Sequence, residues 1–168
     1  TQSLWHYARA LAYHAKGDRA AATREQAAFE KMRSGLPSDA IFINNKGATI
    51  LLLASEVLKA NLALDADSIA HWKKAVEVQD GLVYDEPPPW YFPAREGLGS
   101  ALFRMGRYAE AEKVFRDELD RTPRSGRLLY GLHQALLKQG KVADAIWVKA
   151  EHDRAVRKSP APQRPEGL

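Results

Sequence analysis

A short pattern of small residues recurs four times along the chain, at intervals of 34 to 48 residues. In each occurrence a glycine or an aspartate is followed five residues later by an alanine. Glycine permits the positive φ of a tight turn, and alanine lets two helix backbones approach closely. Self-similarity at this kind of interval is typical of helical repeat arrays. The pattern therefore predicts an all-α protein of about four helix–turn–helix repeats. The pairs are Gly17 and Ala22, Asp65 and Ala70, Gly106 and Ala111, and Gly140 and Ala145.

The best-developed repeat spans residues 92–125, where apolar residues recur at helical spacing on both sides of Gly106. Pro123 cannot continue a helix, so it ends this repeat. Phe115 is expected to fill the space between this repeat and the next one. The predicted helices are 2–16, 19–33, 46–64, 67–80, 90–105, 108–121, 126–139 and 142–157.

These residues resemble the tetratricopeptide repeat, a helix–turn–helix family with a specific column pattern. The resemblance implies a right-handed α-solenoid that spans residues 1–158, followed by a proline-rich flexible tail at 159–168. The matching columns of the best repeat are Leu98, Gly99, Leu102, Gly106, Tyr108, Ala111, Phe115 and Pro123. The implied repeats are about 3–36, 51–84, 92–125 and 126–159, with insertions at 37–50 and 85–91.

The insertion 85–91 joins three prolines to a run of aromatic residues, and it is similar to segments of uncharacterised bacterial repeat proteins. We therefore expect a bacterial origin. The first repeat begins without an obvious polar capping helix, so we also expect the chain to be a region of a longer protein. The prolines fix an extended conformation, after which Trp90, Tyr91 and Phe92 should begin a helix, with at least one of them facing away from the core. Either this loop binds a ligand or peptide, or it packs between the second and third repeats through Trp90. The insertion 37–50 is expected to extend the next helix and to pack residues 41–43 on it.

In this family the first helix of each repeat lines the inner surface, which here implies a polar groove that also includes Ser55 and Lys59. The resemblance implies a non-enzymatic scaffold that holds a protein or peptide partner in this groove. The alternative is a small-molecule or anion-binding module that uses Trp90, Tyr91 and nearby arginines. The candidate binding residues are Tyr84, Trp90, Tyr91, Arg95, Arg104, Arg127, Tyr130 and Gln134.

The charge is concentrated near the C-terminus, where residues 121–158 hold nine basic and three acidic residues. A basic last repeat can attract nucleic acid, which is the third and least favoured function. A solvated helix face is the simpler explanation of these charges.

Several kinds of chemistry have no sequence support. The chain has no cysteine, and its five histidines are scattered singly, so no metal site is predicted. It lacks the phosphate-loop, Gly-x-Ser-x-Gly and His-Glu-x-x-His patterns. No apolar run approaches the ~18 residues of a membrane-spanning helix. We predict no catalytic residues, no cofactor and no membrane span. The composition suits the bacterial cytoplasm and the periplasm equally well, so the compartment stays open.

Overall fold

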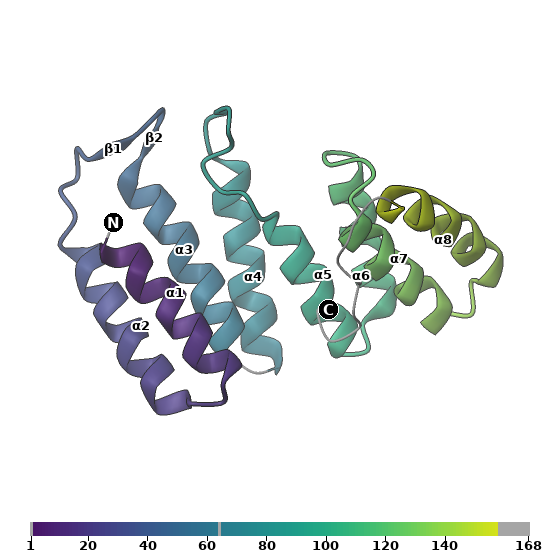
Figure 1. Ribbon diagram of the computed structural model, residues 1–168, viewed down its shortest axis with the longest axis horizontal. Coiled ribbons are helices and arrows are strands. Elements are labelled where there is room, and N and C mark those ends of the chain that lie inside the picture. The colour runs from purple at the N-terminus through teal and green to yellow at the C-terminus, as the bar shows by residue number, and fades with distance from the viewer. Residues whose placement is uncertain (1, 64, 158–168) are drawn as a thin grey trace. The chain divides into compact units, whose positions relative to one another are not determined.

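The structure is a computed structural model that describes residues 2–63 and 65–157. The described residues form eight α-helices and one two-stranded antiparallel hairpin (Figure 1). The predicted all-α helical repeat is therefore confirmed, while the predicted tail at 159–168 lies outside the described residues. In chain order the elements are α1 (Gln2–Ala15), α2 (Arg19–Ser34), β1 (Ile41–Phe42), β2 (Asn45–Lys46), α3 (Gly47–Leu62), α4 (Asp65–Asp80), α5 (Ala94–Arg104), α6 (Tyr108–Leu119), α7 (Gly126–Lys138) and α8 (Val142–Val156).

The turns between paired helices depend on glycine, as the repeat pattern predicts. Gly17, Gly106 and Gly140 have φ values of 77°, 73° and 73°. Side chains other than glycine are strained in this left-handed region. Each of these glycines therefore lets the chain reverse direction between the two helices of one repeat.

The chain divides into two compact units, Thr1–Ala94 and Arg95–Leu168, which we call the N-terminal and C-terminal units. In the N-terminal unit α1 packs with α2, and α3 packs with α4 and against the first pair. In the C-terminal unit α7 packs against both α6 and α8. The arrangement of all repeats in one right-handed solenoid stays a prediction.

The core of the N-terminal unit centres on Phe29 of α2, which is fully buried. Ala10 of α1 and three residues of α3 pack around it. Small residues on α1 and α2 allow these helices to approach each other closely, since Ala22 is also buried. The three α3 residues are Leu51, Ala54 and Leu58.

In the C-terminal unit the fully buried ring of Phe115 lies between two helices that carry glycine at the contact. A Cβ atom on Gly99 of α5 would lie 2.5 Å from this ring, and one on Gly131 of α7 would lie 2.6 Å from it. The ring thus joins α5, α6 and α7, as expected of a residue between repeats. Of the four predicted close-approach alanines, Ala22, Ala111 and Ala145 are buried, whereas Ala70 of α4 is exposed.

Two expectations about the insertions are wrong. Residues 41–43 do not pack on α3, because they belong to the hairpin and Ile41, Phe42 and Ile43 are 66%, 47% and 59% exposed. The helix predicted from residue 90 begins at Ala94. The reason is Pro93, since the residue before a proline is disfavoured in helical conformation and proline itself is tolerated only in the first turn of a helix.

Candidate functional site

The two insertions are bound to each other by a group of hydrogen bonds that we call the asparagine clasp (Asn44, Asn45, Val83 and Asp85). The Asn45 side chain pairs with the Val83 backbone, at 2.8 Å from N–H to Oδ1 and 2.9 Å from Nδ2 to the carbonyl oxygen. The carboxylate of Asp85, which is only 5% exposed, accepts from Asn45 Nδ2 at 3.1 Å and from the side-chain amide of Asn44. The clasp fixes the start of the α4–α5 loop on the hairpin.

The other end of this loop is held by α4 and α1. Gln79 of α4 accepts a hydrogen bond from the Ala94 N–H at 2.6 Å and donates one to the Phe92 carbonyl at 3.2 Å. Trp90 packs against the core cluster and meets Tyr7 of α1 edge-on, with the ring centroids 5.8 Å apart. Burial raises the pKa of Tyr7 to about 12. Trp90 therefore serves packing, with α1 as its partner.

Three aromatic side chains of the same loop point into solvent, and we call them the aromatic loop (Tyr84, Tyr91 and Phe92). They are 78%, 82% and 59% exposed. Tyr91 and Phe92 contact each other edge-to-face at 5.5 Å. The Tyr84 hydroxyl donates to Glu86, and this hydrogen bond and the carboxylate charge raise the pKa of Tyr84. Sequence reasoning therefore located an exposed aromatic element, with Tyr91 at its centre.

Two of the predicted arginines have internal partners in the C-terminal unit. Arg95 lies 3.7 Å from the carboxylate of Glu118, a residue that is 5% exposed. Arg127 of α7 forms an ion pair with Glu96 of α5. These contacts link α5 to α6 and α5 to α7, so they stabilise the repeats.

The other predicted residues of this unit lie on α5 and α7. Arg104 is exposed and makes no hydrogen bond or ion pair with any residue that the structure describes. Tyr130 is half-buried, with its ring 5.8 Å from that of His152. The Gln134 amide lies 3.2 Å from His133 Nδ1. Burial, together with the nearby Lys149 and His152, lowers the pKa of His133, as expected of a packing histidine.

Comparison with known proteins addresses the C-terminal half. Residues 97–160 match the family model of the tetratricopeptide repeat. This segment contains tetratricopeptide repeats. No curated protein matches the chain.

The matched tetratricopeptide segment covers α6, α7, α8 and most of α5, including the turns at Gly106 and Gly140. These are the last two repeats that the residue pattern predicts. Tetratricopeptide repeats mediate protein interactions, so the match supports a protein-interaction scaffold at a general level.

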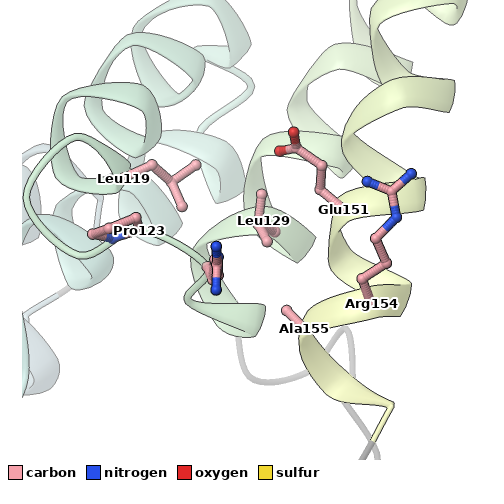
Figure 2. Close-up of a pocket in the computed structure, with 7 residues that line it drawn as sticks. Leu119, Pro123, Leu129, Glu151, Arg154 and Ala155 are labelled. Atoms are coloured by element: carbon pink, nitrogen blue, oxygen red, sulfur yellow. The ribbon is translucent and has the colours of Figure 1, made fainter.

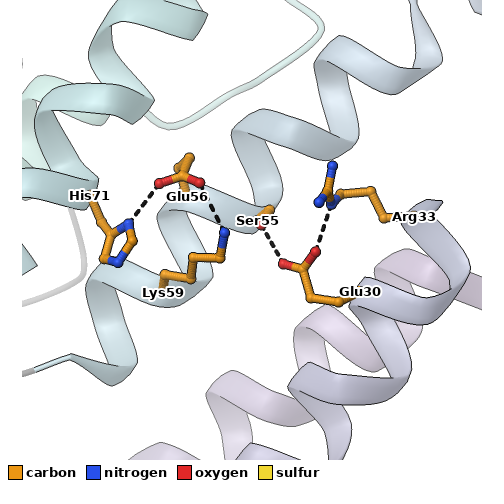
Figure 3. A network of polar contacts seen from close by, with 6 residues as sticks. All are labelled: Glu30, Arg33, Ser55, Glu56, Lys59 and His71. Atoms are coloured by element: carbon orange, nitrogen blue, oxygen red, sulfur yellow. Dashed lines mark hydrogen bonds and ion pairs between the residues drawn. The ribbon is translucent and has the colours of Figure 1, made fainter.

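A polar network that the sequence did not reveal lies outside the matched tetratricopeptide segment (Figure 3). Ser55 and Lys59, which were expected to face the groove, take part in it. Ser55 is fully buried and donates to Glu30 of α2, which also binds Arg33 at 2.7 Å. The adjacent carboxylate on α3 pairs with Lys59 at 3.0 Å and with a histidine on α4 at 2.7 Å. That carboxylate is Glu56, and the histidine is His71.

The network cross-links α2, α3 and α4. Each of its two carboxylates has two partners within the network. Burial alone would raise the pKa of Glu56, but the hydrogen bonds and charges of His71 and Lys59 outweigh it, and the pKa lies below its usual value. A carboxylate that is charged at neutral pH and paired internally has a structural role. Within residues 2–63 and 65–157, no three histidine or acidic side chains cluster as metal ligands would. Among the described helices, none is long and apolar enough to cross a membrane.

Proposed function

We propose that the chain is a non-enzymatic tetratricopeptide-type scaffold that binds a segment of another protein, and that the aromatic loop is a principal contact. The observation that carries this proposal is the combination of anchoring and exposure in one loop. The clasp at Asp85, the packing of Trp90 and the two hydrogen bonds of Gln79 hold the backbone. The same backbone presents Tyr91 with 82% of its surface in water.

This arrangement suits binding for an energetic reason. Association is opposed by the entropy lost when loops and side chains become ordered, about 0.5–1.5 kcal/mol for each mobile side chain. An anchored loop has already lost most of its backbone freedom. Aromatic side chains have few rotatable bonds and bury a large area, so they dominate the affinity of many interfaces. Tyr91 and Phe92 meet both conditions.

The groove-facing candidates of the C-terminal unit form a second part of the proposal. Arg104, Tyr130 and Gln134 lie on the first helices of the two matched repeats, and Arg104 is exposed. Arg104 is the arginine best suited to pair with a partner carboxylate, because Arg95 and Arg127 already pair with Glu118 and Glu96. The same pairing weakens the small-molecule alternative, which needs several available arginines.

The experiment is site-specific photocrosslinking in extract of the native host. A benzophenone amino acid replaces Tyr91 in one sample and Trp147, an exposed aromatic residue of α8, in a matched control. A single protein crosslinked at Tyr91 and not at Trp147 is expected. The purified partner should then bind the wild type at least about tenfold more tightly than a Tyr91→Ser, Phe92→Ser variant. Equal affinity for both would contradict the proposed role of the loop.

A further inference from the structure

A pocket of about 610 Å³ opens on the C-terminal unit, where the end of α6, the α6–α7 turn and the last turns of α8 meet (Figure 2). Its floor is apolar. It consists of Leu119, Pro123, Leu129 and Ala155, of which Leu129 is buried and Pro123 and Ala155 are exposed at the edge. An apolar floor that is open to solvent suits an inserted side chain of a partner, because burying that side chain removes apolar surface from water.

The rim of the pocket carries two arginines and one carboxylate, contributed by Arg124, Arg154 and Glu151. All three are exposed, and none of their side chains makes a hydrogen bond or an ion pair with another residue of 2–63 or 65–157. Glu151 and Arg154 lie one turn apart on α8, and the Glu151 carboxylate is directed to the pocket side of that helix (Figure 2). Most other charged side chains of this unit form ion pairs within it. Three unpaired side chains, two positive and one negative, around one pocket are therefore distinctive.

Arg124 also has an unusual backbone conformation. Its φ of 66° lies in the left-handed region, which favours glycine. Strained residues persist where the surrounding structure holds them, and they concentrate at ligand-binding positions. Here the strained position holds a guanidinium at the pocket rim.

We infer that this pocket binds a short acidic peptide segment of a partner protein. An apolar side chain of the peptide occupies the floor, and a neighbouring aspartate or glutamate pairs with the guanidinium groups of Arg124 and Arg154. Glu151 accepts a hydrogen bond from a peptide N–H. The excess of basic residues in 121–158, nine against three acidic, attracts such a segment from a distance.

A nucleic acid fits the same surface less well. Its phosphates would pair with the arginines, but the apolar floor offers them nothing, whereas an apolar side chain of a peptide fills that floor. The site lies in the C-terminal unit and recognises charge, so it is additional to the aromatic loop of the N-terminal unit. Failure of either proposal leaves the other standing.

The test measures fluorescence anisotropy of a labelled, end-blocked Ser-Asp-Leu-Asp-Ser peptide against the full chain. Saturable binding is expected, and replacing both aspartates by asparagine or the leucine by serine should weaken it at least fivefold. Arg124→Gly should weaken binding about fivefold to tenfold without harming the fold, because glycine accepts the local φ. Arg154→Gln should have a similar effect. The matched control is Arg107→Gln, an exposed arginine of the same unit that does not line the pocket, and it should leave binding unchanged.

Amide chemical shifts locate the site independently. The peptide should shift the resonances of Leu129 and Ala155. Binding that all three arginine variants weaken equally would reflect net charge alone and overturn the proposal. So would the absence of saturable binding at millimolar peptide, or shifts confined to other surfaces. Displacement of the peptide by a short oligothymidylate that itself binds more tightly would assign the surface to nucleic acid instead.

Discussion

The indole ring of Trp90 meets the phenol ring of Tyr7 edge-on, with the two centroids 5.8 Å apart. This contact brings a loop near residue 90 onto the first helix of the chain, more than eighty positions earlier in the sequence. It divides the roles of neighbouring aromatic residues, because Trp90 faces the core of the N-terminal unit while Tyr91 faces water. A variant that replaces both residues at once would therefore not separate a loss of stability from a loss of binding.

The separate substitutions Trp90→Ala and Tyr91→Ala should have different effects on stability. Loss of the partly buried indole should lower the free energy of unfolding by about 2–3 kcal/mol, somewhat less than for a fully buried aromatic residue. Loss of the exposed phenol should change it by less than about 0.5 kcal/mol. Urea denaturation followed by far-ultraviolet circular dichroism compares the two. Equal losses for both variants would contradict the inward and outward assignment.

The ring of Phe115 sets a limit on residue size at Gly131. A Cβ added there would lie 2.6 Å from the ring, so Gly131→Ala should lower the free energy of unfolding by about 1–3 kcal/mol through overpacking. Phe115→Ala should cost about 3–5 kcal/mol through the cavity that it leaves. Denaturant titrations of the single variants measure both values.

A double variant tests whether the glycine and the ring are coupled. In a Phe115→Leu background the smaller side chain leaves room for a methyl group, so Gly131→Ala should cost at least about 0.5 kcal/mol less than in the wild type. Additive losses would mean that the contact with Phe115 does not account for the effect of Gly131→Ala, since helix propensity alone would favour alanine at this position.

The repeat pattern was sufficient to predict most helix boundaries, because the turn glycines and buried alanines are local signals. The turn at Gly106 requires a positive φ, and the helix contact at Ala111 requires a small side chain. Each requirement can be read from one short segment of the sequence. The predicted start of α5 at residue 90 differs from the observed start at Ala94, because Pro93 disfavours helical conformation in the residue before it. The repeat pattern also matches only part of the chain at the family level, from residue 97 onward.

Long-range polar contacts were out of reach of sequence reasoning. Asn44 and Asp85 lie 41 positions apart, and no periodicity connects two insertions that fall outside the repeats. The apolar residues 41–43 were expected to pack on the next helix, but they lie in the hairpin and are exposed. Among the candidate site residues, the run of three aromatics predicted that at least one of them would face away from the core, and Tyr91 and Phe92 are exposed. The internal pairing of Arg95, in contrast, depends on where Glu118 lies.

Asp85→Asn tests whether the clasp fixes the loop. The carboxylate accepts hydrogen bonds from two asparagine side chains, and an amide at this position would direct one of its own donors at them. Leaving buried polar groups unpaired costs about 1–3 kcal/mol, so the free energy of unfolding should fall by that amount. Amide hydrogen exchange should also accelerate at Val83, whose N–H donates to Asn45. Unchanged exchange at Val83 would show that the loop keeps its position without the clasp.

The pH dependence of stability should include a contribution from Glu56. Its pKa in the folded protein is lowered by His71 and Lys59 against the opposing effect of burial. A lowered carboxylate pKa stabilises the folded state above the ordinary glutamate pKa of about 4.3, and this stabilisation is lost as the pH falls through the folded value. Glu56→Gln should therefore destabilise the protein at pH 7, and the difference from the wild type should shrink as the pH falls below about 4.

Urea denaturation at a series of pH values measures this difference. Glu77→Gln is the matched control, because Glu77 pairs with Lys74 on the exposed surface of the same helix as His71. Exposed ion pairs contribute about 0–1 kcal/mol, so this variant should lie close to the wild type at every pH. A Glu56→Gln deficit that stays constant from neutral to acidic pH would mean that the side chain contributes through packing and not through its charge. In that case the ion pairs with His71 and Lys59 would not explain why a carboxylate is buried between α3 and α4.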